Sequence, residues 1–182
     1  MSIRREYEQH GVAGYYQQFG AAYRNPHELA VRRALRAAVA AWAPDLTCVL
    51  DLACGSGEAT LALRAAGAAQ VAGIDPYTAA AYAERTGRPA ETFTFEAIAA
   101  GALDGRAYSL IVCSYALHLL APSRLPRLAY QLSRLAPALW VLTPHQRPHL
   151  RPAWGWALAG ELREARVRVR RYAAAAPPVE KQ

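Results

Sequence analysis

Between residues 46 and 143, short apolar runs of strand length alternate with stretches whose apolar residues recur at helical spacing. A change of period from two to about 3.6 marks each change from strand to helix. Strands that alternate with helices along a chain form a parallel sheet with helices on both faces. The pattern therefore predicts an α/β fold, a single doubly wound, Rossmann-like domain with a mostly parallel central sheet.

We expect about six strands in this sheet. The predicted strands cover residues 46–52, 69–75, 91–95, 108–114, 138–143 and 166–173. The predicted helices cover residues 56–67, 76–87, 123–135 and 154–165. Near the C-terminus, "WGWALAGELREA" has the pattern of a helix, whereas "RVRVRRYA" alternates as a half-exposed strand does.

The chain has 182 residues, the size of one ordinary domain. We expect residues 1–176 to form that domain, with residues 177–182 as a tail. Within it, residues 1–43 form an N-terminal helical segment, and residues 46–143 form the ligand-binding core. Residues 144–173 then supply a substrate-side loop, a helix and the terminal strand.

A helix is predicted to begin just after Asn25. Asn25 is a favoured N-cap residue, Pro26 suits the first helical position, and Glu28 suits the third. Four apolar residues share one face of this helix: Val31, Leu35, Val39 and Trp42. We expect that face to pack on the domain.

Composition narrows the class of protein. Apolar residues make up 53% of the chain, yet no segment approaches the roughly 18 uncharged apolar residues of a membrane span. The N-terminal "MSIRREYEQHG" is charged where a secretory signal is apolar, so we expect a cytoplasmic protein with no membrane partner. The three cysteines are odd in number and form no C-x-x-C pair, which argues against disulfides and zinc fingers.

The stretch "VLDLACGSGEATLAL" places Gly55 and Gly57 at the end of the first predicted strand. Glycine adopts positive φ without strain and lets backbone approach a ligand, and the helix that follows offers free N–H groups. In doubly wound sheets, ligands bind outside the carboxyl ends of the strands. We therefore expect a ligand site at this turn.

The residues around the turn favour a cationic ligand over a dinucleotide. A dinucleotide fingerprint needs a third glycine where Thr60 stands, and Glu58 lies where a pyrophosphate would sit. No arginine or lysine between residues 51 and 60 offsets that glutamate. An ammonium and a sulfonium, as in S-adenosylmethionine, fit the acidic surroundings of Asp51 and Glu58. Asp75, at the end of the second predicted strand, can accept hydrogen bonds from ribose hydroxyls in either ligand.

Over about residues 45–145 the sequence resembles the class I S-adenosylmethionine-dependent methyltransferases. The motif D-L-A-C-G-S-G is similar to the family's first motif. The resemblance implies that Asp51, Ala53 and the backbone of Gly55 to Gly57 hold the methionine part of S-adenosylmethionine, which becomes S-adenosylhomocysteine on transfer. It also implies that the N-terminal segment is a helical lid, with Tyr23 against the cofactor.

Three further segments carry the resemblance. "GIDPY" is similar to the second motif, which implies Asp75 on the ribose and Pro76 beside the adenine. "FEAI" is similar to the segment that reads the adenine edge, here Glu96 and the amide of Ala97. "CSYALHLL" is similar to the fourth motif, which implies that the backbone of Ser114 lies near the methionine amino group.

Two histidines are candidates for the catalytic chemistry. Methyl transfer is an in-line displacement on an electrophile that the cofactor supplies, so a base is optional. A base would lie past the fourth or fifth predicted strand, which indicates His118 or His145, although His118 could instead line the site. His145 and His149 are four residues apart, but Pro148 argues against the helix that would bring both to one metal, so we expect no metal.

The sequence departs from the family's pattern at its C-terminal end. The family's seven-stranded sheet ends in a β-hairpin, whereas here only residues 165–173 are available as a terminal strand, so we expect a missing strand. No long insertion is present to read a nucleic acid or a protein. Substrate selection should rest on the N-terminal segment and the loop from Thr143 to Trp156, a small surface that suits a small molecule.

Two alternatives stay open, and the sequence does not indicate the oligomeric state. The net charge of +7 and the arginines near the C-terminus favour an RNA methyltransferase, although charge also protects an exposed edge strand from aggregation. These arginines are Arg147, Arg151, Arg163, Arg166, Arg168, Arg170 and Arg171. Alternatively, the domain binds the cofactor without catalysis, as a partner's subunit.

Overall fold

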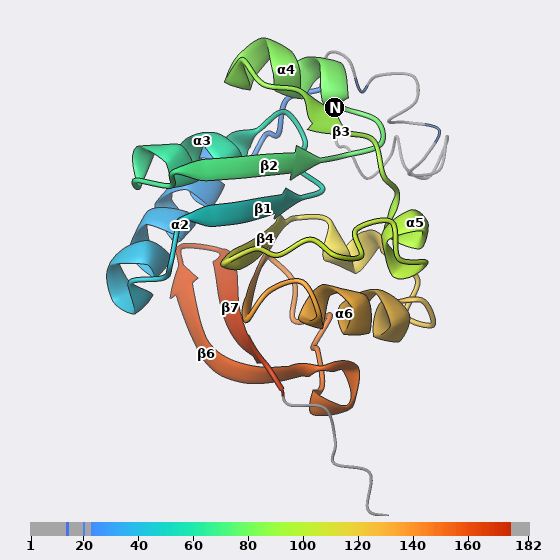
Figure 1. Cartoon of the computed structure of the whole chain (residues 1–182). Helices are drawn as coiled ribbons and strands as arrows, with labels where there is room; N and C mark the ends of the chain where they lie inside the picture. The colour runs from blue at the N-terminus through green and yellow to red at the C-terminus, as the bar shows by residue number, and fades with distance from the viewer. Residues whose placement is uncertain (1–13, 15–19, 21–22, 176–182) are drawn as a thin grey trace, which may run out of the picture.

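The computed structural model describes residue 14, residue 20 and residues 23–175, which contain one sheet of seven strands (Figure 1). The strands are β1 (Cys48–Leu52), β2 (Gln70–Ile74), β3 (Ala90–Glu91), β4 (Leu110–Ser114), β5 (Ala138–Thr143), β6 (Trp156–Glu164) and β7 (Val167–Ala174). Their order in the sheet is β3-β2-β1-β4-β5-β7-β6. Strands β1 to β5 are parallel to one another, β7 runs antiparallel to β5, and β6 runs antiparallel to β7.

Helices cover both faces of the sheet, which confirms the predicted fold class. They are α2 (Glu28–Trp42), α3 (Glu58–Ala65), α4 (Ala79–Thr86), α5 (Phe95–Ala99) and α6 (Leu125–Ser133), with short 3-10 helices at Leu117–Leu119 and Pro152–Trp154. Helices α2 and α3 pack together on one side of the sheet, and α5 and α6 on the other (Figure 1). Among the helices that the structure describes, none has the length and apolarity to cross a membrane.

Alternate residues of the central strands face two separate hydrophobic cores. On β1, Val49 packs with α2 and α3, whereas Leu50 packs with α5 and α6. Leu110 and Ile111 divide in the same way on β4. Because both faces are buried, these strands are apolar throughout, which is why the sequence pattern located them.

Helix α2 packs on the sheet through the predicted face. Val31 and Leu35 are buried, and Val39 and Trp42 are partly buried against the same core. The helix begins at Glu28 rather than directly after Asn25, since the Asn25 side chain accepts a hydrogen bond from the His27 amide at 2.8 Å and closes a turn first. Apart from residues 14 and 20, the segment before residue 23 lies outside the described residues, as does the predicted tail.

The C-terminal hairpin corrects two of the predictions. Residues 154–165 were expected to be a helix, but most of them form β6, which pairs with β7 from Trp156 to Glu164. The sheet therefore contains the strand that was expected to be missing. Alanine, leucine, glutamate and arginine favour a helix locally, and pairing along the length of β7 overrides that preference.

The third predicted strand, residues 91–95, is also largely wrong. Only Ala90–Glu91 pair with β2, and Phe95 already belongs to α5. The cause is the side chain of Thr94, whose Oγ1 accepts a hydrogen bond from the Ala97 amide at 3.1 Å and caps the helix. The aromatic residues of "ETFTF" obscured this helix start.

Trp156 anchors the hairpin to α6, so we predict that Trp156→Ala destabilises the whole domain. The side chain is fully buried, and its Nε1 donates to the Ala129 carbonyl at 2.8 Å. Truncating a buried tryptophan costs about 3–5 kcal/mol in the free energy of unfolding, measured by urea titration.

Leu158→Ala on the same strand is the matched control, because this side chain is 52% exposed and should change the free energy of unfolding by no more than about 0.5 kcal/mol. Equal effects of the two substitutions would contradict an integral hairpin.

Candidate functional site

A cavity of about 270 Å³ lies at the carboxyl ends of β1, β2 and β4. Seven of the residues predicted to bind the cofactor line it: Tyr23, Ala53, Gly55, Asp75, Pro76, Glu96 and Ser114. Three others do not line it: Asp51, Gly57 and Ala97. The topology thus gathers residues from five separate segments at the edge of the sheet where ligands bind in such folds.

The two glycines of the β1–α3 turn have different reasons to be glycine. Gly55 has φ +56° and lines the cavity, where a Cβ would stand 3.2 Å from the Tyr23 ring. Gly57 has φ +91°, and a Cβ there would stand 2.5 Å from the methyl group of Thr86 on α4. Gly55 therefore shapes the cavity, whereas Gly57 permits close packing of two helices.

Asp51 is fully buried behind this turn. Its Oδ2 accepts hydrogen bonds from the Thr60 amide at 2.9 Å and from the Thr60 hydroxyl at 2.7 Å. Its Oδ1 is buried without a hydrogen-bond partner among the described residues. Burial raises the pKa of the Asp51 carboxyl from its ordinary value to about 7. A cation placed near Oδ1 would compensate for the hydration that the ionised carboxylate loses on burial.

Asp75 connects the turn to the neighbouring strand. Its Oδ2 accepts from the Gly55 amide at 3.2 Å, and its Oδ1 accepts from the amides of Tyr77 at 2.9 Å and Thr78 at 3.1 Å. Burial raises the pKa of the Asp75 carboxyl, and these backbone hydrogen bonds oppose that rise. The carboxylate both holds the local backbone and lines the cavity.

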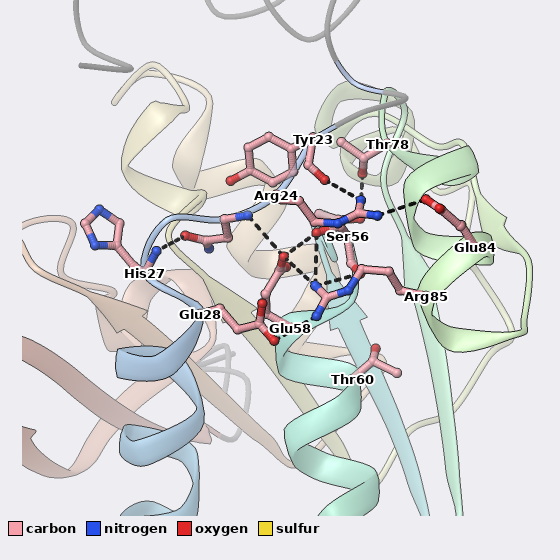
Figure 2. A network of polar contacts seen from close by, with 12 residues as sticks. Tyr23, Arg24, His27, Glu28, Ser56, Glu58, Thr60, Thr78, Glu84 and Arg85 are labelled. Carbon is pink, nitrogen blue, oxygen red and sulfur yellow. Dashed lines mark hydrogen bonds and ion pairs between the residues drawn. The ribbon is translucent and has the colours of Figure 1, made fainter. Parts of the chain in front are cut away.

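Glu58 is not the uncompensated charge that the sequence indicated. Arg85 of α4 reaches its carboxylate at 3.1 Å and also contacts Glu28 of α2 at 2.7 Å (Figure 2). Glu58 further accepts hydrogen bonds from the Ser56 hydroxyl and from the Asn25 amide. The acidic character that favours a cationic ligand therefore comes from Asp51 and Asp75. Arg85 lies 27 residues from Glu58 in the chain, so local sequence gave no sign of the pair.

The N-terminal segment is attached beside the cavity at several points. Arg24 pairs with Glu84 at 2.9 Å, the Asn25 amide donates to Glu58 at 3.2 Å, and the His27 ring stacks on Tyr115 at 5.0 Å. Tyr23 lines the cavity itself. The part of the predicted lid that the structure describes thus contacts α3, α4 and the end of β4.

Glu96 and Ala97 lie at the start of α5. Glu96 lines the cavity and pairs with Arg124 at 2.5 Å, and both side chains are exposed. A backbone hydrogen bond, together with Arg124, lowers the pKa of Glu96. The Ala97 amide, which the resemblance assigned to the adenine edge, donates to Thr94 instead. That amide serves the helix cap.

His118 and His145 lie against each other outside the cavity lining, with ring centroids 4.5 Å apart. His118 is half-buried, and its Nδ1 has no hydrogen-bond partner among the described residues. Burial and the neighbouring His145 lower the pKa of His118 to about 4. His118 is therefore neutral at pH 7 and a weak proton acceptor. The exposed His145 is the better placed of the two to take a proton.

Tyr115, within the segment similar to the fourth motif, lines the cavity with φ +56°, a strained conformation for a residue with a side chain. Sequence reasoning missed four apolar side chains that also line the cavity: Phe93, Phe95, Leu119 and Leu120. They come from segments that were predicted as strand and loop, so no periodic pattern pointed to them.

Comparisons with known proteins identify the fold and the family. A family profile described as a methyltransferase domain matches residues 49–137. An uncharacterized protein of Schizosaccharomyces pombe is 34% identical over 198 aligned positions, which cover 85% of this chain and 79% of the relative.

Solved structures share this architecture. Magnesium protoporphyrin IX methyltransferase from Synechocystis PCC 6803, with bound S-adenosylmethionine, matches with a TM-score of 0.62 and 18% identity over 95% of this chain and 96% of its own. The N-methyltransferase NodS from Bradyrhizobium japonicum, in complex with S-adenosylhomocysteine, matches with a TM-score of 0.65 and 14% identity over 88% and 97%. At these identities, the likeness shows the fold alone.

We predict that Arg85→Met lowers the free energy of unfolding by about 3 kcal/mol, because it leaves the buried carboxylate of Glu58 without its cation. Adding Glu58→Gln should recover part of this loss, since the double variant buries no unpaired charge. Urea titration of the single and double variants measures both effects.

Arg88→Met, just beyond α4, is the matched control, because the Arg88 side chain is exposed and makes no ion pair among the described residues. An Arg85→Met effect no larger than the control's would show that the buried pair adds nothing to stability.

Proposed function

Because this chain belongs to the class I S-adenosylmethionine-dependent methyltransferases, we propose that it transfers the cofactor's methyl group to a small-molecule acceptor. The main observation in support is the modest cavity at the carboxyl ends of the parallel strands, which residues 23–27 close on one side. For the acceptor side we propose the segment between β5 and β6, residues 144–155. A cytoplasmic location is part of the same proposal and rests on composition.

The residues of the cavity fit S-adenosylmethionine. Phe93, Phe95 and Leu120 supply apolar walls for a flat base, and Asp75 offers carboxylate oxygens for hydroxyl groups. The unpartnered Oδ1 of Asp51 lies behind the turn, as a counter-charge for an ammonium group. When bound, the cofactor supplies an electrophilic methyl group. The chain's own task is to orient it and to exclude water.

On the acceptor side, His145 is the residue that we propose as proton acceptor. It follows the end of β5, its amide donates to the Thr143 hydroxyl at 3.1 Å, and its ring is exposed. His118 lies beside it as a neutral ring, with the two ring centroids 4.5 Å apart. A base at this place would remove the acceptor's proton as the methyl group arrives.

The arginines on β7 weaken the RNA alternative. Arg168 and Arg170 occupy alternate positions, as a phosphate-tracking face requires, but both pair with Glu161 of β6. Arg170 is fully buried. Exposed arginines without an ion pair in the described residues, such as Arg163 and Arg166, keep RNA as the second candidate acceptor. A cofactor-binding subunit without catalysis is the third alternative.

The test is transfer of labelled methyl from S-adenosylmethionine into a cell extract that is then separated into small-molecule, RNA and protein fractions. Label in the small-molecule fraction alone supports the proposal. Label in RNA that ribonuclease releases, with binding that falls steeply as salt rises, replaces it with the RNA alternative. Cofactor binding with no transfer into any fraction supports the non-catalytic alternative. Asp75→Asn is the negative control. It removes a charge from the cavity wall, so transfer that depends on this cavity should be weaker in the variant than in the wild type.

We predict that the affinity for S-adenosylmethionine rises with pH up to about pH 7 and then levels off. The pKa of Asp51 in the free protein is raised to about 7 by burial, so below that pH the carboxyl is protonated and uncharged. An ammonium favours the ionised form, so binding below pH 7 must expel a proton. The gain is at most about tenfold per pH unit, measured by calorimetry.

Asp51→Asn, which keeps the shape and removes the titration, should bind more weakly above pH 7 and show a flatter profile. A wild-type profile as flat as that of Asp51→Asn would remove Asp51 from the binding of the cofactor.

A further inference from the structure

Arg170 of β7 is a fully buried cation that does not line the cofactor cavity. Its Nε donates to Glu161 Oε2 at 2.9 Å. Its Nη1 donates to the Pro148 carbonyl at 2.9 Å, and its Nη2 donates to the Gln146 carbonyl at 2.5 Å. A buried guanidinium is tolerated when its donors are paired, and here two of the three partners belong to one loop.

That loop, residues 144–151, runs from the end of β5 over one face of β7. Side chains two residues apart on a strand share a face, so Arg168, Arg170 and Tyr172 point to the same side. The Tyr172 hydroxyl accepts from the Leu150 amide at 3.3 Å, beside the two carbonyls that Arg170 holds. The loop therefore packs on this face of β7.

The hydrogen bonds of Arg170 fall close to His145 in the chain. Gln146 follows His145 directly, and Pro148 lies two residues further. Just before these hydrogen bonds in the chain, the His145 amide donates to the Thr143 hydroxyl and joins the start of the loop to β5. Between these attachments, the His145 ring lies 4.5 Å from the His118 ring. Releasing the Gln146 carbonyl would free His145 on its C-terminal side.

We infer that Arg170 is a positioning residue for the acceptor side, which holds the loop after β5 so that His145 lies against His118. A role for Arg170 in catalysis rests on the proposed methyl transfer. The position of the two histidine rings does not depend on that proposal and can be measured without an acceptor. The planar guanidinium presents its donors in a rigid fork that reaches acceptors on β6 and at two places in the loop, whereas the three donors of a lysine ammonium all lie on one compact, flexible group. Besides Arg170, the charged and titratable groups around the loop are His118, His145, Arg147, His149, Arg151, Glu161, Arg168 and Tyr172.

The test is Arg170→Lys, with the histidine rings titrated by NMR in the absence of acceptor. In the wild type, burial and His145 hold the pKa of His118 near 4. A released loop admits water and moves His145 away, so this pKa should rise toward 6.5, by about one pH unit or more. Cofactor affinity, measured by calorimetry, should stay within about twofold of wild type, because Arg170 does not line the cavity.

Arg171→Lys is the matched control. Arg171 is the next residue on β7, and its side chain points to the opposite face. That side chain makes no hydrogen bond or ion pair with the described residues. The pKa of His118 should be the same in this variant as in the wild type.

An unchanged His118 pKa in folded Arg170→Lys, even with a lower melting temperature, would reduce Arg170 to a stabilising residue and overturn the inference. If Arg170→Lys does not fold, Glu161→Gln weakens the hold on the guanidinium instead, and the same two outcomes apply. Absence of methyl transfer by the wild type would refute the proposed function while leaving the titration result intact. Once an acceptor is known, Arg170→Lys should lower kcat and leave the KM for the cofactor unchanged.

Discussion

Gly55 is held by both of its backbone polar groups, and the shape of the cavity depends on this attachment. Its amide donates to the Asp75 carboxylate, and its carbonyl accepts from the Thr78 hydroxyl at 2.7 Å. Both partners follow β2, so the turn after β1 is fixed to the end of the neighbouring strand. These hydrogen bonds hold the positive φ of Gly55 before any ligand arrives. Ligand binding therefore does not have to offset the loss of conformational entropy that ordering this turn would cost.

The carboxylates near this turn divide two tasks between them. Glu58 is neutralised by Arg85, which also reaches Glu28, so its charge joins α2, α3 and α4. Asp51 has no cationic partner among the described residues, and one of its oxygens has no hydrogen bond. Burying a charge without a partner destabilises a fold, and the proposed role of Asp51 as the counter-charge of a cationic cofactor would give this carboxylate a partner. In that proposal, Glu58 stabilises the fold, whereas Asp51 holds Thr60 and also serves the cofactor.

The parts of this protein that sequence predicts well are those governed by local patterns. The buried strands were visible as apolar runs, and the turn was visible through Gly55 and Gly57. What the sequence missed depends on contacts between distant residues. The pairing of β6 with β7 overrides a helical composition, and Arg85 meets Glu58 only because the fold brings the last turn of α4 to the start of α3. The local sequence pattern contains no information about either of these contacts, because the partners lie far apart in the chain.

The arginines of β7 show why a pattern can be recognised and still be misread. Alternation correctly indicated that Arg168 and Arg170 share a face, but it could not show which side of the sheet that face meets. Since the loop after β5 covers it, the arginines serve Glu161 and two backbone carbonyls rather than phosphates.

This arrangement separates the two halves of the site. Backbone pairing and the β1–α3 turn shape the cavity, whereas side chains of the terminal hairpin hold the loop that we propose for the acceptor side. Because no residue of β6, β7 or this loop lines the cavity, substitutions there should leave its shape unchanged. If the proposed acceptor side is right, the hairpin affects acceptor choice through the loop that it holds, and not through the cavity.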